Sequence, residues 1–92
     1  MLKLKQSGTF RKELKLMRRR GADISKLDYV IQKLLNEEQL EEKYQDHALK
    51  GDQRGNRECH IEPDRLLVYK VDKGNLILTA LQTGSHSDIF GK

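Results

Sequence analysis

Residues 57–81, RECHIEPDRLLVYKVDKGNLILTAL, determine the architecture of the sheet. Three runs of strand length lie within them, about 57–61, 66–71 and 76–81. The last two are rich in apolar and β-branched residues, and the first alternates Cys59 and Ile61 with polar side chains. The segments between the runs, Glu-Pro-Asp at 62–64 and Asp-Lys-Gly-Asn at 72–75, have the composition of tight turns. Because both connections are short, the three runs are predicted to pair as consecutive antiparallel hairpins.

Upstream of these runs the apolar spacing changes to that of helices. Leu2 and Leu4 alternate with lysines, which is typical of a short, half-buried strand. Two windows then carry apolar side chains three or four positions apart, at Phe10, Leu14 and Met17 and at Leu27, Val30, Ile31 and Leu34. Because only a short segment with Gly21 separates the windows, the two helices are predicted to form an antiparallel hairpin whose apolar stripes both face the sheet.

The chain is long enough for one domain with one modest core, since it has 92 residues. We therefore predict a single domain, residues 1–92, of the α+β class, in the order strand, helix, helix and three strands. The sheet is predicted to have four mainly antiparallel strands, with the helix hairpin packed on one face. The other face is then partly open to solvent, and strand alternation puts Glu58 and His60 on the side opposite to Cys59 and Ile61.

Charge is distributed unevenly along the chain. Residues 1–20 contain eight Lys and Arg against one acid, whereas residues 21–46 contain three against seven, and the formal net charge is +4. A basic surface favours a polyanion or an acidic protein as partner. The acidic second segment argues against a protein that wraps nucleic acid around its whole surface.

Cys59 is the single cysteine, so an internal disulfide is impossible and a disulfide-stapled secreted domain is excluded. No signal peptide is expected, since residues 1–5 alternate apolar with charged side chains and lack an apolar core. No run approaches the roughly 20 apolar residues of a membrane span. We therefore expect a cytoplasmic protein without membrane contact.

The three histidines, His47, His60 and His86, lie in residues 44–69 and 83–90. Histidine readily gives or takes a proton near neutral pH, so three in one small domain indicate acid/base chemistry. Cleavage of RNA without a metal needs a base for the 2′-hydroxyl, an acid for the departing 5′-oxygen, and a cation or hydrogen-bond donors for the charged phosphorane. Histidines suit the first two roles. The cations that suit the third are Lys50, Arg57 and Arg65.

A metal site is the main alternative for a cluster of His, Cys and Asp. Cys59 and His60 are predicted to point to opposite sides of a strand, His47 lies in a separate loop, and no Cys-x-x-Cys pair exists. We therefore expect neither a metal site nor a cofactor.

Four segments and Phe90 resemble the YafQ branch of the RelE-like bacterial toxins. The segments are 45–51 (QDHALKG), 57–64 (RECHIEPD), 67–70 (LVYK) and 83–86 (TGSH). The resemblance implies the RelE-like microbial RNase fold and the toxin half of a type II toxin-antitoxin pair. It implies a ribosome-dependent endoribonuclease that cleaves messenger RNA in the A site without a metal and so inhibits translation. The implied partners are a cognate antitoxin in a heterotetramer, messenger RNA, the ribosome with its RNA, and operator DNA only through the antitoxin.

The same resemblance implies the roles of individual residues. His47, His60, Asp64 and His86 fall where the family keeps its catalytic residues, and Phe90 falls where a ring stacks on a base. We expect His86 to protonate the leaving oxygen and either His47 or His60 to receive the 2′ proton. Asp64 is expected to orient an imidazole or to share the proton.

The chain departs from the family pattern at two positions. Gln82 stands where relatives carry an Arg, and loss of one such donor commonly costs about 10²-fold or more in rate. Arg65 stands where some relatives carry a Trp, and its charge is available to compensate for Gln82. The residues expected to bind substrate are Lys50, Arg57, Arg65, Gln82 and Phe90. The alternatives are a catalytically impaired RelE-fold protein that only binds antitoxin or ribosome, and a generic basic RNA-binding domain.

Overall fold

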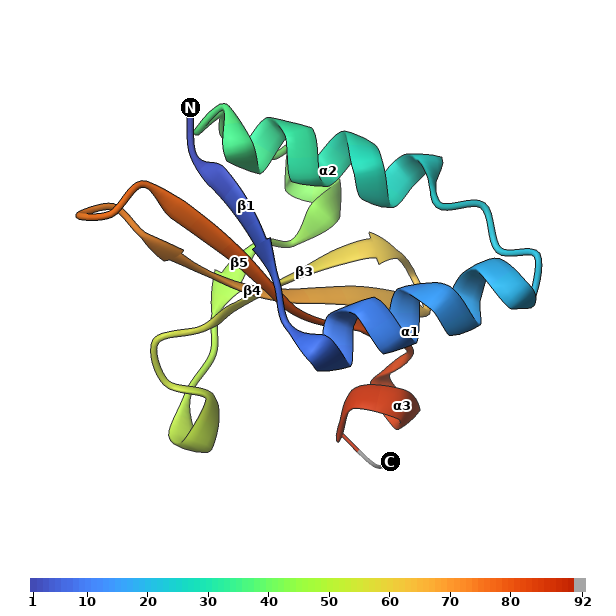
Figure 1. Ribbon diagram of the computed structural model, residues 1–92. Helices are drawn as coiled ribbons and strands as arrows, with labels where there is room; N and C mark the ends of the chain where they lie inside the picture. The colour runs from blue at the N-terminus through green and yellow to red at the C-terminus, as the bar shows by residue number, and fades with distance from the viewer. Residues whose placement is uncertain (91–92) are drawn as a thin grey trace.

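The computed structural model describes residues 1–90 of the chain (Figure 1). The helices are α1 (Gly8–Arg19), α2 (Ser25–Leu35) and α3 (His86–Phe90), and two short 3-10 helices are η1 (Glu42–Tyr44) and η2 (Gly51–Gln53). The strands are β1 (Lys3–Gln6), β2 (His47–Ala48), β3 (Arg57–Glu62), β4 (Arg65–Asp72) and β5 (Ile77–Gly84). The predicted order of a strand, two helices and three long strands is confirmed.

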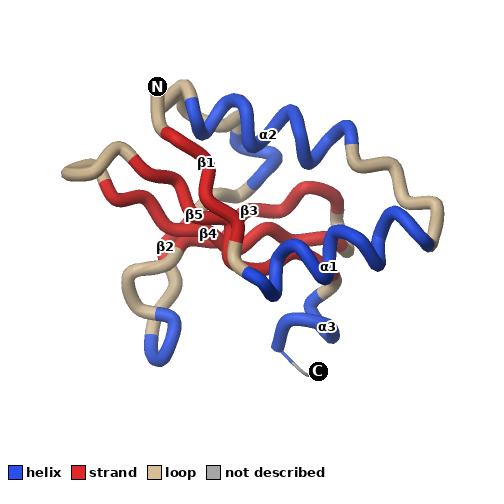
Figure 2. Tube along the Cα trace, viewed as in Figure 1, coloured by secondary structure: helices blue, strands red, loops and turns tan. Residues whose placement is uncertain are grey.

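The strands form one sheet in the order β1-β5-β4-β3-β2, which Figure 2 shows in red. β1 runs parallel to β5, and every other neighbouring pair is antiparallel. The α+β class is confirmed, but the predicted count of four strands is wrong, because β2 adds a fifth at the edge. β2 has only two residues, both exposed, so it leaves no apolar pattern in the sequence.

Helices α1 and α2 run in opposite directions and cover one face of the sheet (Figure 1). α1 begins at Ser7, whose hydroxyl accepts a hydrogen bond from the Phe10 N–H at 2.9 Å, a normal N-terminal cap. The core joins the predicted stripes of both helices to alternate residues of β3, β4 and β5, among them Cys59, Ile61, Leu67, Tyr69, Leu78 and Ala80.

The prediction of a half-buried first strand holds only in part. Leu2 is buried, but Leu4 is 39% exposed, because β1 is the outermost strand and has a neighbour on one side only. Among the described residues, no helix is long and apolar enough to span a membrane.

Candidate active site

The three histidines meet on the sheet face opposite α1 and α2. β3 turns Cys59 and Ile61 into the core, so its intervening side chains lie on the other face. The ring centroids of His47 and His60 are 6.4 Å apart, and those of His60 and His86 are also 6.4 Å apart. The three imidazoles therefore lie together on this face, with His60 between the other two.

Glu58 is the carboxylate that lies among these rings. Its side chain is 5% exposed, and its Oε2 lies 3.0 Å from His47 Nε2. Its Oε1 lies 3.7 Å from His86 Nε2 and has no hydrogen-bond partner within residues 1–90. A buried carboxylate is costly unless hydrogen-bond donors or positive charge face it, and the imidazoles of His47 and His86 are the groups that face Glu58. Sequence reasoning put Glu58 on this face but gave it no role, although its position two residues before His60 on one strand was a usable signal.

Hydrogen bonds fix the orientation of the His47 ring. Its Nδ1 lies 2.7 Å from the carbonyl oxygen of Gln45, a residue with φ of 48°. Its Nε2 faces the Glu58 carboxylate. Both partners are hydrogen-bond acceptors, so both ring nitrogens of His47 are engaged by neighbouring groups.

A partly buried network anchors the segment that carries His47. The Tyr69 hydroxyl donates a hydrogen bond of 2.6 Å to Asp46 Oδ1, and the Arg57 guanidinium contacts both oxygens of Asp46 at 3.3 Å. Burial, and then the hydrogen bond to Asp46, raise the pKa of Tyr69. Arg57 was predicted to bind substrate, but its side chain is engaged by Asp46 and belongs to the side of β3 opposite His60.

A tight turn after β5 presents His86. Gly84 has φ of +146°, and a Cβ there would lie 3.2 Å from Asp88. Asp88 Oδ2 accepts from the Ser85 N–H at 3.2 Å, while the Asp88 N–H donates to Ser85 Oγ at 3.1 Å, which caps α3. The Phe90 ring centroid lies 5.2 Å from that of His86, so the predicted stacking residue lines the same site.

The start of α1 holds the strand that leads to His86. Pairing of β1 with β5 ends at Ala80, whose carbonyl accepts from the Ser7 N–H at 3.0 Å. The Ser7 hydroxyl donates to the Leu81 carbonyl at 2.7 Å, and the Thr83 N–H donates to Glu13 Oε1 at 3.1 Å. Burial is the main cause that raises the pKa of Glu13. The side chains of Ser7 and Glu13 thus bind the part of β5 that lies beyond the end of β1. The sequence analysis assigned this role to neither residue.

Gln82 lies on the histidine face. It pairs with Val68 on β4, and Val68 pairs with Glu58 on β3, so the three residues form one row across the sheet. No contact joins Gln82 to a histidine among the described residues, and the neutral amide adds no charge to the face.

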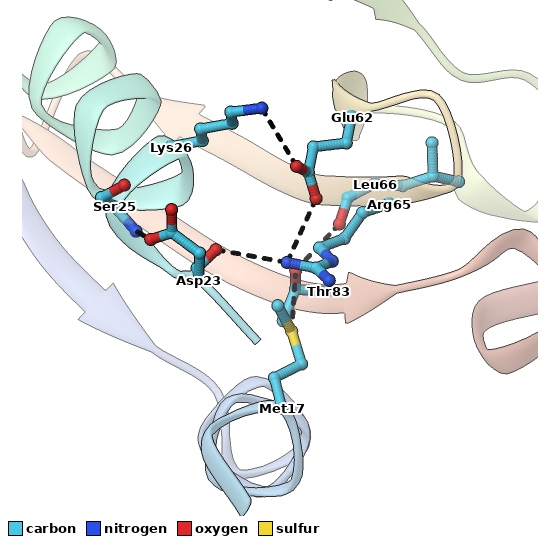
Figure 3. A network of polar contacts seen from close by, with 8 residues as sticks. All are labelled: Met17, Asp23, Ser25, Lys26, Glu62, Arg65, Leu66 and Thr83. Carbon is cyan, nitrogen blue, oxygen red and sulfur yellow. Dashed lines mark hydrogen bonds and ion pairs between the residues drawn. The ribbon is translucent and has the colours of Figure 1, made fainter. Parts of the chain in front are cut away.

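The other predicted residues lie away from the three rings. Arg65 contacts Glu62 Oε2 at 3.3 Å and donates to the Asp23 carbonyl at 3.3 Å, beside the loop between α1 and α2 (Figure 3). Asp64 is exposed in the turn between β3 and β4, and Lys50 is exposed before η2. Among the described contacts neither reaches a histidine, so both assignments stay predictions.

Residues 1–90 contain no group of three or more His, Cys, Asp or Glu side chains placed to hold a metal ion. Cys59 is fully buried, and burial is the main cause that raises the pKa of its thiol to about 12. It therefore belongs to the core, as its alternation with His60 predicted.

A protein-family model and a sequence relative both match nearly the whole chain. A family model described as "Bacterial toxin of type II toxin-antitoxin system, YafQ" matches residues 2–91. The mRNA interferase toxin YafQ of Escherichia coli K12 is 39% identical over 90 residues, which cover 96% of this chain and 95% of that protein.

Solved structures agree in fold. The crystal structure of a metal-bound toxin from Helicobacter pylori has a TM-score of 0.92 and 42% identity, and covers 98% of this chain and 100% of that one. The toxin in the E. coli DinJ-YafQ complex has a TM-score of 0.89 and 36% identity, and covers 99% of this chain and 100% of that one.

Proposed function

This chain belongs to the YafQ family of bacterial toxins of type II toxin-antitoxin systems, and from that premise we propose that it is an endoribonuclease acting on messenger RNA. We further propose that it cleaves in the ribosomal A site, in the cytoplasm, by general acid/base catalysis. The observation that carries the proposal is the cluster of three imidazoles on the sheet face opposite α1 and α2, two of which face one buried carboxylate.

The distances suit transfer of two protons at one phosphate. A catalytic group acts across a hydrogen bond of about 2.6–3.2 Å. Rings with centroids 6.4 Å apart can therefore each reach a different oxygen of the same phosphodiester. In the reaction, a base removes the 2′ proton, the 2′-oxygen attacks phosphorus, and an acid protonates the departing 5′-oxygen. The products are a 2′,3′-cyclic phosphate and a new 5′-hydroxyl end.

We assign His60 as the base and His86 as the acid. The described contacts of His60 are ring contacts only, so its nitrogens are available, whereas both nitrogens of His47 face acceptors. The His86 side chain is 60% exposed and its Nε2 lies 3.7 Å from Glu58 Oε1, so the ring is open to a leaving oxygen and has a carboxylate beside it. Glu58 and His47 then act together to position the two reacting rings and to stabilise positive charge beside the phosphate.

The test is expression of the chain without an antitoxin, followed by primer extension on translated messages. The proposal predicts growth arrest and new 5′ ends within codons, and loss of both in a His86→Ala variant with unchanged circular dichroism. His86 is exposed, so this variant is expected to fold. New ends that are equally abundant with His86→Ala would contradict the assignment of the acid.

A catalytically silent binding protein of the same fold is the second candidate. Gln82 is neutral, and Arg57 and Arg65 are engaged in ion pairs away from the histidines. Neither of the two arginines predicted to bind substrate is therefore free at the histidines in the described part of the chain, which supports impaired catalysis. Gln82→Arg separates the two candidates, because an impaired enzyme becomes more toxic when the cation is restored, while a silent binder does not.

We also propose that this chain has an antitoxin of its own, with operator DNA contacted only through that antitoxin. The support is the E. coli relative, which was solved as a DinJ-YafQ complex. Coexpression with the adjacent open reading frame and light scattering of the purified complex test this proposal. The proposal is contradicted if the chain stays uncomplexed and toxic when it is coexpressed with the product of each neighbouring gene.

A further inference from the structure

A groove runs beside His60, between α2, η1 and the outer edge of β3. Its volume is about 870 Å³, and its lining includes Lys26, Tyr29, Lys43, Tyr44, His60 and Glu62. The groove exists because β2 pairs only with Arg57 and Glu58, so the rest of the β3 edge has no strand beside it. Sites for small molecules commonly have volumes of about 300–1,000 Å³.

His60 connects this groove to the candidate active site. Its ring is one of the groove walls, and it also lies between the rings of His47 and His86. An RNA strand with its reacting phosphate at these rings therefore has an opening for an adjacent nucleotide on the His60 side. Access requires no movement of the sheet, since the groove borders solvent along the free edge of β3.

Tyr29 gives the groove an aromatic surface that a base can stack on. The residue is 45% exposed, and its hydroxyl donates a hydrogen bond of 2.9 Å to Glu41 Oε2, which fixes the ring. Its centroid lies 6.3 Å from that of Tyr44, which is buried and supports it. Fixed, exposed aromatic rings are the usual stacking surfaces for unpaired bases.

The carboxylates of the groove are already neutralised. Glu41 contacts Lys33 Nζ at 3.1 Å, in addition to the Tyr29 hydroxyl. Glu62 contacts Lys26 Nζ at 3.1 Å and the Arg65 guanidinium at 3.3 Å, as Figure 3 shows. An approaching phosphate therefore meets paired carboxylates and their cations.

Lys43 supplies the positive charge that remains available. Its Nζ lies 5.3 Å from the Tyr44 ring centroid, and no ion pair of Lys43 occurs among the described residues. Lys43 is therefore available to bind a phosphate, and the nearby ring of Tyr29 is available to stack on a base, so together they suit one nucleotide.

We propose that the groove binds one unpaired nucleotide of the RNA, next to the phosphate that is cleaved, with its base on Tyr29 and its phosphate at Lys43. This inference rests on the proposed function. It deepens that function, because the subsite selects RNA that is single-stranded and extended next to the cleaved phosphate.

The test is single-turnover cleavage of messenger RNA on programmed ribosomes, measured at increasing concentrations of the protein. Tyr29→Ala is expected to raise the half-saturating concentration about 5- to 100-fold, the effect of losing one stacked base, and to leave the maximal rate within about twofold. Tyr29→Phe keeps the stacking ring beside Tyr44 and loses only the hydroxyl contact with Glu41, so it is expected to raise the half-saturating concentration much less than Tyr29→Ala. Lys43→Ala is expected to raise the half-saturating concentration and to weaken its salt dependence.

Lys73→Ala is the matched control, because Lys73 is exposed in the turn between β4 and β5, outside the groove. If Tyr29→Ala and Lys43→Ala cleave like Lys73→Ala, the nucleotide site is refuted while the nuclease stands. If these variants lose only capture by the antitoxin, the groove binds a protein and the inference is again refuted. If the parent cleaves nothing, the proposed function itself fails and the subsite falls with it.

Discussion

Replacement of Tyr69 by Phe tests the network that anchors the His47 segment. The Tyr69 side chain is 2% exposed, and its hydroxyl donates a 2.6 Å hydrogen bond to the Asp46 carboxylate. A hydrogen bond to a charged group contributes about 1.5–3 kcal/mol. Loss of that amount lowers the melting temperature by about 4–8 °C per kcal/mol in a domain of this size, or about 6–24 °C in all. Tyr69→Phe is therefore expected to unfold much earlier in urea and in heat.

The assay is urea denaturation of the parent, of Tyr69→Phe, of Asp46→Asn and of the double variant. The four proteins give the coupling free energy between Tyr69 and Asp46. A value above about 0.5 kcal/mol identifies a direct interaction, because the changes in the free energy of unfolding caused by two distant substitutions add to within that limit. Tyr29→Phe is the matched control, because it removes a tyrosine hydroxyl from an exposed contact with Glu41 and is expected to change the midpoint little. If Tyr69→Phe unfolds at the parent's urea concentration, the network does not anchor the segment and the reasoning is wrong.

Four further predictions follow from the site and the core. Glu58→Gln is expected to slow cleavage about 10²- to 10⁴-fold, as loss of a positioned acid/base partner does. Its affinity for the ribosome is expected to change little, and pelleting with ribosomes measures that affinity. Gly84→Ala is expected to be unstable and inactive, because its φ of +146° is unfavourable with a Cβ and the new atom lies 3.2 Å from Asp88; thermal unfolding and primer extension measure both effects. The Cys59 thiol, whose pKa burial raises to about 12, is expected to resist maleimide until urea unfolds the chain, which mass spectrometry detects. Burial raises the pKa of Glu13 in the folded state, so ionisation of Glu13 opposes folding. The stabilising contribution of the protonated carboxyl is present below about pH 4.3 and is lost as the pH rises through the folded pKa. Glu13→Gln is therefore expected to gain stability relative to the parent as the pH rises through this range, which urea titrations at several pH values measure.

The main strands and helices could be predicted because their apolar spacing is regular. The stripe through Phe10 and Met17 is buried as expected, and Cys59 and Ile61 alternate with His60 as a two-sided strand requires. Strand β2 escaped prediction because a strand of two exposed residues, His47 and Ala48, is too short to show a period. Its place is fixed by pairing of His47 with Glu58, which is a tertiary contact.

The candidate site could be predicted only where residue type was informative. Histidines are rare and chemically distinctive, so His47, His60 and His86 stood out, whereas Glu58 is one of many acids and was given no role. Its importance depends on burial, and burial of a charged residue is decided by neighbours from other strands. The sequence also could not show that the guanidinium of Arg57 would be taken by Asp46, because that contact joins two segments through a loop.

The assignment of His86 as the acid can be measured with an RNA whose scissile 5′-oxygen is replaced by sulfur, cleaved on programmed ribosomes. A thiolate leaves without a proton, so the need for an acid disappears while the need for a base remains. We expect His86→Ala to be slow on ordinary RNA and restored to nearly the parent's rate on the sulfur-containing RNA, whereas His60→Ala stays slow on both. Equal slowing of His86→Ala on the two RNAs, or full activity of His60→Ala, would contradict proton transfer by these two imidazoles at one phosphate.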